Sequence, residues 1–360
     1  SSRSGCLVGA ACVIRIESQA MKLDVSAVPL PVFFFLWYTS SVLCTTLSKV
    51  LVRDVFSSAC WLSLAQFMVA TCVANLMVRL VDGKPPVRIP AGAVGKQMRR
   101  DVWALSIVFS FGMLALNKGY EHMHVSLVET LRATEPVVSA ALATALLPAE
   151  APSLLQTMAL VPIVAGASCS SFGSQDFTAS GLLWVLASNL CFCLRTIQYK
   201  EVSKTYQLND WNLFYLICKC GIVCQLLFSL AFHPAGLYET VSKLHHAACS
   251  DRVFAFVAVL LNGAMYYTYL QCSWVILSRI SVVTHAVGNS MRRPVVLVCN
   301  VLYFGNEITT LNIAGIMLAF SGVFLFTRVK SQESSMLARR LRTHLEPEVV
   351  KLQIDKGPRV

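Results

Sequence analysis

Charged residues are scarce in this sequence. Only 14% of its 360 residues are Asp, Glu, Lys or Arg, whereas 56% are hydrophobic and the mean hydropathy is +0.62. A soluble protein needs roughly 25% charged residues to keep its surface hydrated. The low charge therefore excludes a soluble multidomain protein, and it also excludes disordered and coiled-coil chains. An integral membrane protein with many spans is the class that remains.

Motifs of catalysis and metal binding are also missing. The sequence contains no HExxH motif, no P-loop and no Ser-His-Asp order. Fourteen cysteines are present, but most lie in apolar runs without metal-ligand spacing, where cysteine behaves as a small hydrophobic residue. We therefore expect no enzyme activity, no metal and no cofactor. The net charge of +11 is expected to reflect basic cytosolic loops rather than a nucleic-acid partner.

Apolar stretches of about 20 residues recur along the chain, as the thickness of a bilayer requires. They predict an all-α integral membrane protein of ten transmembrane helices, because the spans of a β-barrel would be half as long and would alternate. The predicted spans are Val32–Val52, Phe56–Leu80, Val102–Tyr120, Val125–Leu147, Leu154–Ser171, Ser180–Thr196, Trp211–Phe232, Phe254–Leu277, Val282–Phe304 and Ile308–Phe326.

The distribution of Lys and Arg predicts the orientation in the membrane. With ten spans, most basic loop residues fall on the side that both termini share, so both termini should be cytosolic. Residues 329–360 form a basic cytosolic tail that we expect to lie on the lipid bilayer. Residues 1–28 form an N-terminal tail in which Met21 is a candidate start. If residues 1–20 are genuine, their Ser, Arg and Ala content is weakly compatible with a transit peptide.

Two segments of the chain resemble one another. EPVVSAALATALLPAEAPSLLQTMALVPIVAG (Glu135–Gly166) aligns with RPVVLVCNVLYFGNEITTLNIAGIMLAFSG (Arg293–Gly322). The two segments are five spans apart, and five is odd, so the second copy is predicted to be inverted in the membrane. The predicted halves are five-helix repeats at residues 29–172 and 173–328. The alternative explanation of the similarity is that any two apolar helical hairpins look alike.

Charged residues inside the predicted spans are the candidates for a functional site. The fourth span contains Glu129, Arg132 and Glu135, and the ninth contains Arg292 and Arg293. A charge at mid-bilayer costs roughly 2.5 to 3.5 kcal/mol, so these residues need compensation. One interpretation is a buried salt-bridge network, which would compensate part of this cost. Its three arginines would still exceed its two carboxylates by one positive charge. The other interpretation is an arginine cluster that binds a phosphate or carboxylate bidentately.

The ninth span has a polar stripe. His285, Asn289 and Arg292 follow one another at helical spacing, with Arg293 beside them. Pro136 and Pro294 directly follow the charged residues of the two segments, where a proline frees backbone groups and kinks a helix beside a cavity. Both features favour a binding site in the interior of the bundle.

The motifs around these charges resemble a known family. TLRATEP (Thr130–Pro136), RISVVTHAVGNSMRRPVV (Arg279–Val296) and GIMLAFSGVFLFTRVK (Gly315–Lys330) are similar to the triose-phosphate and sugar-phosphate translocator family of the drug/metabolite transporter superfamily. The resemblance extends from FFFLWYTSSVLCTTLSK (Phe33–Lys49) to Lys330. It implies the drug/metabolite transporter fold, with two inverted five-helix repeats.

The resemblance also implies residue roles. Arg132, Arg292 and Arg293 match the cations that hold the substrate phosphate in plastid members, and Tyr269 matches the tyrosine that contacts the rest of the substrate. Two of the matched cations are lysines in those members, which keeps the charge but changes the hydrogen-bond geometry. Glu129 stands where phosphate translocators commonly have histidine. Glu129, Glu135, His285 and Asn289 are therefore assigned to support or to proton coupling.

The sequence favours a secondary antiporter that exchanges a phosphorylated sugar for inorganic phosphate. A nucleotide-sugar exchanger is the first alternative, and a proton-coupled metabolite transporter is the second. Without a convincing presequence, the Golgi or endoplasmic reticulum membrane is expected, with the plastid envelope as the alternative. The expected partners are a phosphorylated small molecule, inorganic phosphate and the bilayer, and a homodimer is compatible with the sequence.

Overall fold

The computed structural model describes residues 28–146, 152–172, 177–280, 282–305 and 309–354. This part of the chain contains helices and no strands. It divides into two compact units that do not follow the chain in order. Unit 1 consists of Ser1–Glu129, Asp176–Ile280 and Val295–Asn306, and unit 2 consists of Thr130–Gln175, Ser281–Pro294 and Glu307–Val360.

Unit 1 is a bundle in which each long helix packs against partners distant in sequence. The closest pairs are α4 with α8, α11 with α2, α3 with α9, and α4 with α9. A short helix, α10, joins α9 to α11. The bounds of these helices are α2 Leu30–Asp54, α3 Ala59–Asp82, α4 Ala93–His122, α8 Ala179–Tyr206, α9 Asp210–Phe232, α10 Gly236–His246 and α11 Cys249–Arg279.

Within the residues that the structure describes, seven helices are long and apolar enough to cross a membrane: α2, α3, α4, α8, α9, α11 and α13. Their outward faces carry large apolar side chains such as Leu183, Phe256 and Met317, each more than 60% exposed. On helices of this length, such surfaces are typical of contact with lipid. The protein is therefore an integral membrane protein of helices, as the sequence predicted. The count of ten spans and the cytosolic position of both termini stay predictions.

Amides and hydroxyls fill part of the interior of unit 1. Gln66 of α3 donates to Ser48 and to Asn262, at 3.1 and 2.9 Å, and it accepts from Asn117 at 2.8 Å. Asn262 in turn donates to Ser48 and to the carbonyl of Cys44. Side-chain hydrogen bonds of this kind hold helices together where lipid tails are as apolar as the helix surfaces. They connect α2, α3, α4 and α11.

The fourth predicted span, Val125–Leu147, is not one helix. The structure ends α5 (Val125–Arg132) at Arg132 and begins α6 (Glu135–Leu146) after a gap of two residues. Pro136 explains the break, because its ring lacks an N–H and clashes with the carbonyl four residues earlier, which is that of Arg132. The kink expected at Pro136 is thus a break between two helices, whereas Pro294 lies within the continuous helix α12 (Val282–Phe304).

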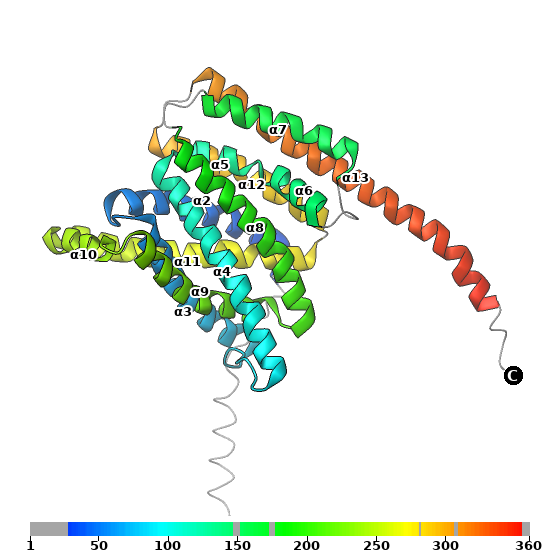
Figure 1. Ribbon diagram of the computed structural model, residues 1–360, viewed down its shortest axis with the longest axis horizontal. Coiled ribbons are helices and arrows are strands. Elements are labelled where there is room, and N and C mark those ends of the chain that lie inside the picture. Colours follow the sequence, from blue (N-terminus) through cyan, green and yellow to red (C-terminus); the bar gives the residue numbers. More distant parts are fainter. Residues whose placement is uncertain (1–27, 147–151, 173–176, 281, 306–308, 355–360) are drawn as a thin grey trace, which may run out of the picture. The chain divides into compact units, whose positions relative to one another are not determined.

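Unit 2 is built around α7 (Leu154–Phe172) and α13 (Thr310–Ile354), which lie side by side (Figure 1). Glycines allow their backbones to approach: a Cβ added at Gly166 would overlap the backbone of Ala319 and Gly315. Asn312 also donates to the carbonyl of Ser170 at 3.0 Å. Because α7 ends the first predicted repeat and α13 ends the second, this contact joins equivalent helices. The repeat boundaries themselves stay a prediction.

We expect Gly166→Ala to lower the melting temperature of the purified protein in detergent. Alanine favours a helix over glycine by about 1 kcal/mol, but the overlap with the α13 backbone should cost about 1–3 kcal/mol or more. Val164→Leu adds the same volume on the exposed face of α7 and should leave the melting temperature unchanged. A higher melting temperature for Gly166→Ala would show that α7 and α13 are not in this close contact.

Candidate functional site

An ion pair joins α6 to α12 within unit 2. Arg293 of α12 donates to the carboxylate of Glu135, 158 residues earlier in the chain. Arg293 is only 4% exposed, and Glu135 lies in the first turn of α6, where a carboxylate also meets the positive end of the helix dipole. These two residues occupy equivalent positions in the predicted repeats, ahead of Pro136 and Pro294. The predicted site residues Glu135 and Arg293 are thus brought together.

Two further arginines of unit 2 are withdrawn from solvent. Arg132 is 8% exposed and ends α5, and Arg292 is 6% exposed and precedes Arg293 in α12. The negative end of a helix dipole favours a cation at the position of Arg132. Three buried guanidinium groups at roughly 2.5 to 3.5 kcal/mol each would be costly without compensating charge. A planar donor fork is also well suited to oxyanions.

Glu129 is fully buried, and its hydrogen-bond donor was not foreseen from the sequence. The hydroxyl of Tyr120 donates to Glu129 Oε1 at 2.6 Å. The carbonyls of Tyr120 and Met123 both accept from Lys49 Nζ, the latter at 3.0 Å. Lys49 thus caps the end of α4, next to the tyrosine that holds Glu129.

Tyr269 lies on α11 in unit 1 and is partly buried. Its ring packs against a cluster formed by α2 and α11 and stands edge-on to Tyr266, with the ring centroids 5.9 Å apart. The buried members of that cluster are Phe33, Trp37, Cys272, Val275 and Ile276. His285 and Asn289 belong to α12, but their side chains lie outside the described part of the structure. The roles of all three residues stay predictions.

Arg195 of α8 is a half-buried cation that lies among aromatic rings. The sixth span was expected to end at Thr196. In the structure α8 continues to Tyr206, and the Arg195 guanidinium lies over the rings of Phe109 and Trp274, 5.1 and 5.3 Å from their centroids. Cation–π contacts of this kind hold an arginine among aromatic rings. The absence of a helix breaker between Thr196 and Tyr206 was the available signal.

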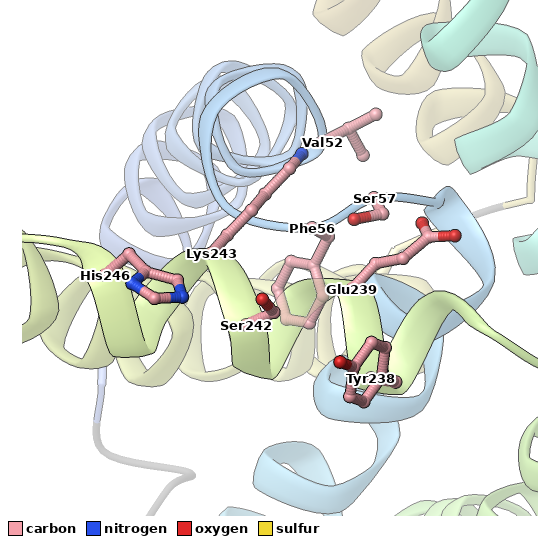
Figure 2. A pocket seen from close by; sticks show the side chains of 8 residues that line it. All are labelled: Val52, Phe56, Ser57, Tyr238, Glu239, Ser242, Lys243 and His246. Atoms are coloured by element: carbon pink, nitrogen blue, oxygen red, sulfur yellow. The ribbon is translucent and has the colours of Figure 1, made fainter.

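One open hollow of about 680 Å³ lies at the surface of unit 1, between the end of α2 and α10 (Figure 2). Its walls mix apolar residues with Lys243, Glu239 and His246. None of the predicted site residues lines it. A composition of this kind is typical of the boundary between lipid and water.

Comparison with known proteins confirms the family resemblance found in the sequence. The family model of the Triose-phosphate Transporter family matches residues 28–327. The chain belongs to this family. It is 28% identical to a non-green plastid triose phosphate/phosphate translocator of Brassica oleracea var. botrytis, over 89% of the chain and 78% of the relative. It is 30% identical to phosphoenolpyruvate/phosphate translocator 1 of Oryza sativa subsp. japonica, over 82% of the chain and 71% of the relative.

A solved crystal structure supports the fold of this Triose-phosphate Transporter family member. The match covers 84% of this chain and 99% of the solved one, with a TM-score of 0.51 and 14% sequence identity. The relatives are translocators, so transport rather than catalysis is the activity of the family. They are named chloroplastic, so the Golgi or endoplasmic reticulum location expected from the sequence is not supported.

Exchanging the charges of the ion pair tests its contribution to stability. We expect Arg293→Glu to lower the free energy of unfolding by about 3–5 kcal/mol, because it leaves two carboxylates where a buried pair stood. The double variant Glu135→Arg/Arg293→Glu should recover most of that loss. Melting temperatures of the purified variants in detergent measure both effects.

Arg53→Glu is the matched control. Arg53 pairs with Asp54 on the surface, where the two side chains are 63% and 42% exposed, and exposed pairs contribute about 0–1 kcal/mol. A double variant no more stable than Arg293→Glu would contradict the pairing of Glu135 with Arg293.

Proposed function

We propose that this chain is a secondary antiporter that exchanges a triose phosphate or another sugar phosphate for inorganic phosphate. The observation that carries the proposal is the excess of positive charge inside the fourth and ninth predicted spans: three buried arginines accompany two carboxylates, Glu129 and Glu135. A phosphate dianion would reverse that excess and would receive bidentate hydrogen bonds from the guanidinium forks. Membership of the Triose-phosphate Transporter family supports the same substrate class.

In this proposal Arg132, Arg292 and Arg293 hold the phosphate group. Tyr269 contacts the rest of the substrate through its hydroxyl, and Glu135 fixes the orientation of Arg293 through their ion pair. Glu129, held by Tyr120, limits the net positive charge of the site. His285 and Asn289 support the polar stripe of α12 on which Arg292 lies.

The exchange mechanism follows from the same charges. Two inverted five-helix repeats would alternate their access around the substrate, with both termini in the cytosol. Without an anion, mutual repulsion of three arginines opposes closure of the site. A bound phosphate or organic phosphate removes the repulsion, so the transporter returns across the membrane only when loaded. Exchange then becomes obligatory.

The plastid envelope is the membrane that we propose for this transporter. The relatives named above are chloroplastic translocators. Of the two locations considered from the sequence, the plastid envelope is therefore the one that these relatives support.

Counter-exchange in proteoliposomes tests the function directly. Vesicles containing the purified chain are preloaded with inorganic phosphate, dihydroxyacetone phosphate or nucleoside monophosphate, and uptake of labelled phosphate is measured. We expect rapid uptake only with internal phosphate or triose phosphate. Arg292→Ala should reduce the rate at least about tenfold, because a charge-assisted hydrogen bond contributes about 1.5–3 kcal/mol. Arg53→Ala, which removes an exposed arginine, should transport normally.

Other results would overturn the proposal. Uptake only against nucleoside monophosphate would indicate a nucleotide-sugar exchanger. Uptake driven by a pH gradient without an internal substrate, and unaffected in Arg292→Ala, would indicate proton coupling through Glu129 or Glu135.

A further inference from the structure

The hollow between the end of α2 and α10 is bounded by a helix that is held in place. The backbone N–H of Ser57 donates to Thr240 Oγ1 at 3.3 Å, and Trp61 Nε1 donates to the carbonyl of His233, just before α10, at 3.0 Å. Leu244, four residues after Thr240, packs against a buried apolar cluster of unit 1. The hollow of about 680 Å³ is therefore part of the fold of unit 1.

The outer face of α10 is apolar and exposed. Leu237, Tyr238 and Val241 are 52%, 78% and 56% exposed. The helix joins α9 to α11, which are both long and apolar enough to cross a membrane. Near the start of α11, Phe254 and Val257 are 54% and 53% exposed. A short helix in this position, with apolar and tyrosine side chains outward, is typical of the boundary between lipid and water.

Charges of both signs line the hollow, at different ends. Lys243 and His246 lie at one end, Glu239 lies at the other, and Phe56 lies between them (Figure 2). Lys243 forms no ion pair with the residues that the structure describes. Glu239 Oε2 is 3.9 Å from His233 Nε2, which is beyond hydrogen-bond distance. The cation and the carboxylate are therefore both available to a ligand.

We propose that this hollow binds the headgroup of a zwitterionic phospholipid from the surrounding bilayer. Lys243 and His246 hold the phosphate, and the ammonium group of a choline lies against Glu239 and the ring of Tyr238. The acyl chains extend along the exposed apolar side chains of α10 and α11. An anionic headgroup without an ammonium group leaves Glu239 without a counter-charge. The proposal does not depend on which substrate the protein transports.

Native mass spectrometry of the delipidated protein in detergent tests the proposal. It measures the Kd of added phosphatidylcholine and of phosphatidylglycerol with the same acyl chains. Lys243→Glu should raise the Kd of phosphatidylcholine about fivefold or more, because attraction to the phosphate becomes repulsion. Glu239→Lys should weaken phosphatidylcholine and strengthen phosphatidylglycerol, because both ends of the hollow are then cationic. Both side chains lie at the surface, so the melting temperature without lipid should stay unchanged.

Lys204→Glu is the matched control. Lys204 is exposed in the last turn of α8 and does not line the hollow, so its reversal should change the Kd of phosphatidylcholine less than about twofold. An equal loss in Lys204→Glu, or no loss in Lys243→Glu, would overturn the proposal. A loss in Lys243→Glu confined to phosphatidylglycerol would indicate an anionic lipid instead. Competition by glycerophosphocholine, which has no acyl chains, at the concentration of the lipid would indicate a soluble ligand and would also overturn the proposal.

Discussion

The structure depends on stabilising buried, charged arginines in a chain whose composition is otherwise apolar and suited to lipid. Arg132, Arg292 and Arg293 are each less than 10% exposed, and each would cost about 2.5–3.5 kcal/mol in the bilayer interior. The fold reduces this cost with the carboxylate of Glu135 and with the dipole of α5. In the proposed function the rest of the compensation comes from the substrate. Affinity for a dianion and obligatory exchange then have one physical cause.

The ion pair also links the sequence repeat to the three-dimensional structure. Glu135 and Arg293 precede the equivalent prolines of the two similar segments, and they are in contact. The helices that end those segments, α7 and α13, pack through glycines at Gly166 and Gly315. Contacts between equivalent elements are expected when two copies of one unit meet around an axis. Opposite charges at equivalent positions of the two similar segments allow α6 and α12 to pair through Glu135 and Arg293.

Much of this could be predicted from the sequence, because lipid imposes a simple rule on composition. Apolar stretches locate the helices approximately, and the charges within those stretches are enough to single out Arg292 and Arg293 as candidate site residues. Two kinds of detail could not be obtained that way. Pro136 divides the fourth predicted span, and a proline pattern alone does not distinguish this from the continuous helix around Pro294. Partners that are distant in sequence, such as the aromatic rings around Arg195, depend on packing that no local pattern encodes.

The most direct test of the account is phosphate binding to the purified protein without transport. A ligand that binds only the folded state stabilises it by about 2.7 kcal/mol at a hundredfold excess over its Kd. We predict that inorganic phosphate raises the melting temperature of the unmodified protein in detergent with a saturable dependence on concentration, and that Arg292→Gln abolishes the shift while Arg53→Gln preserves it. An equal shift in Arg292→Gln, or none in the unmodified protein, would contradict the claim that the buried arginines form the phosphate site.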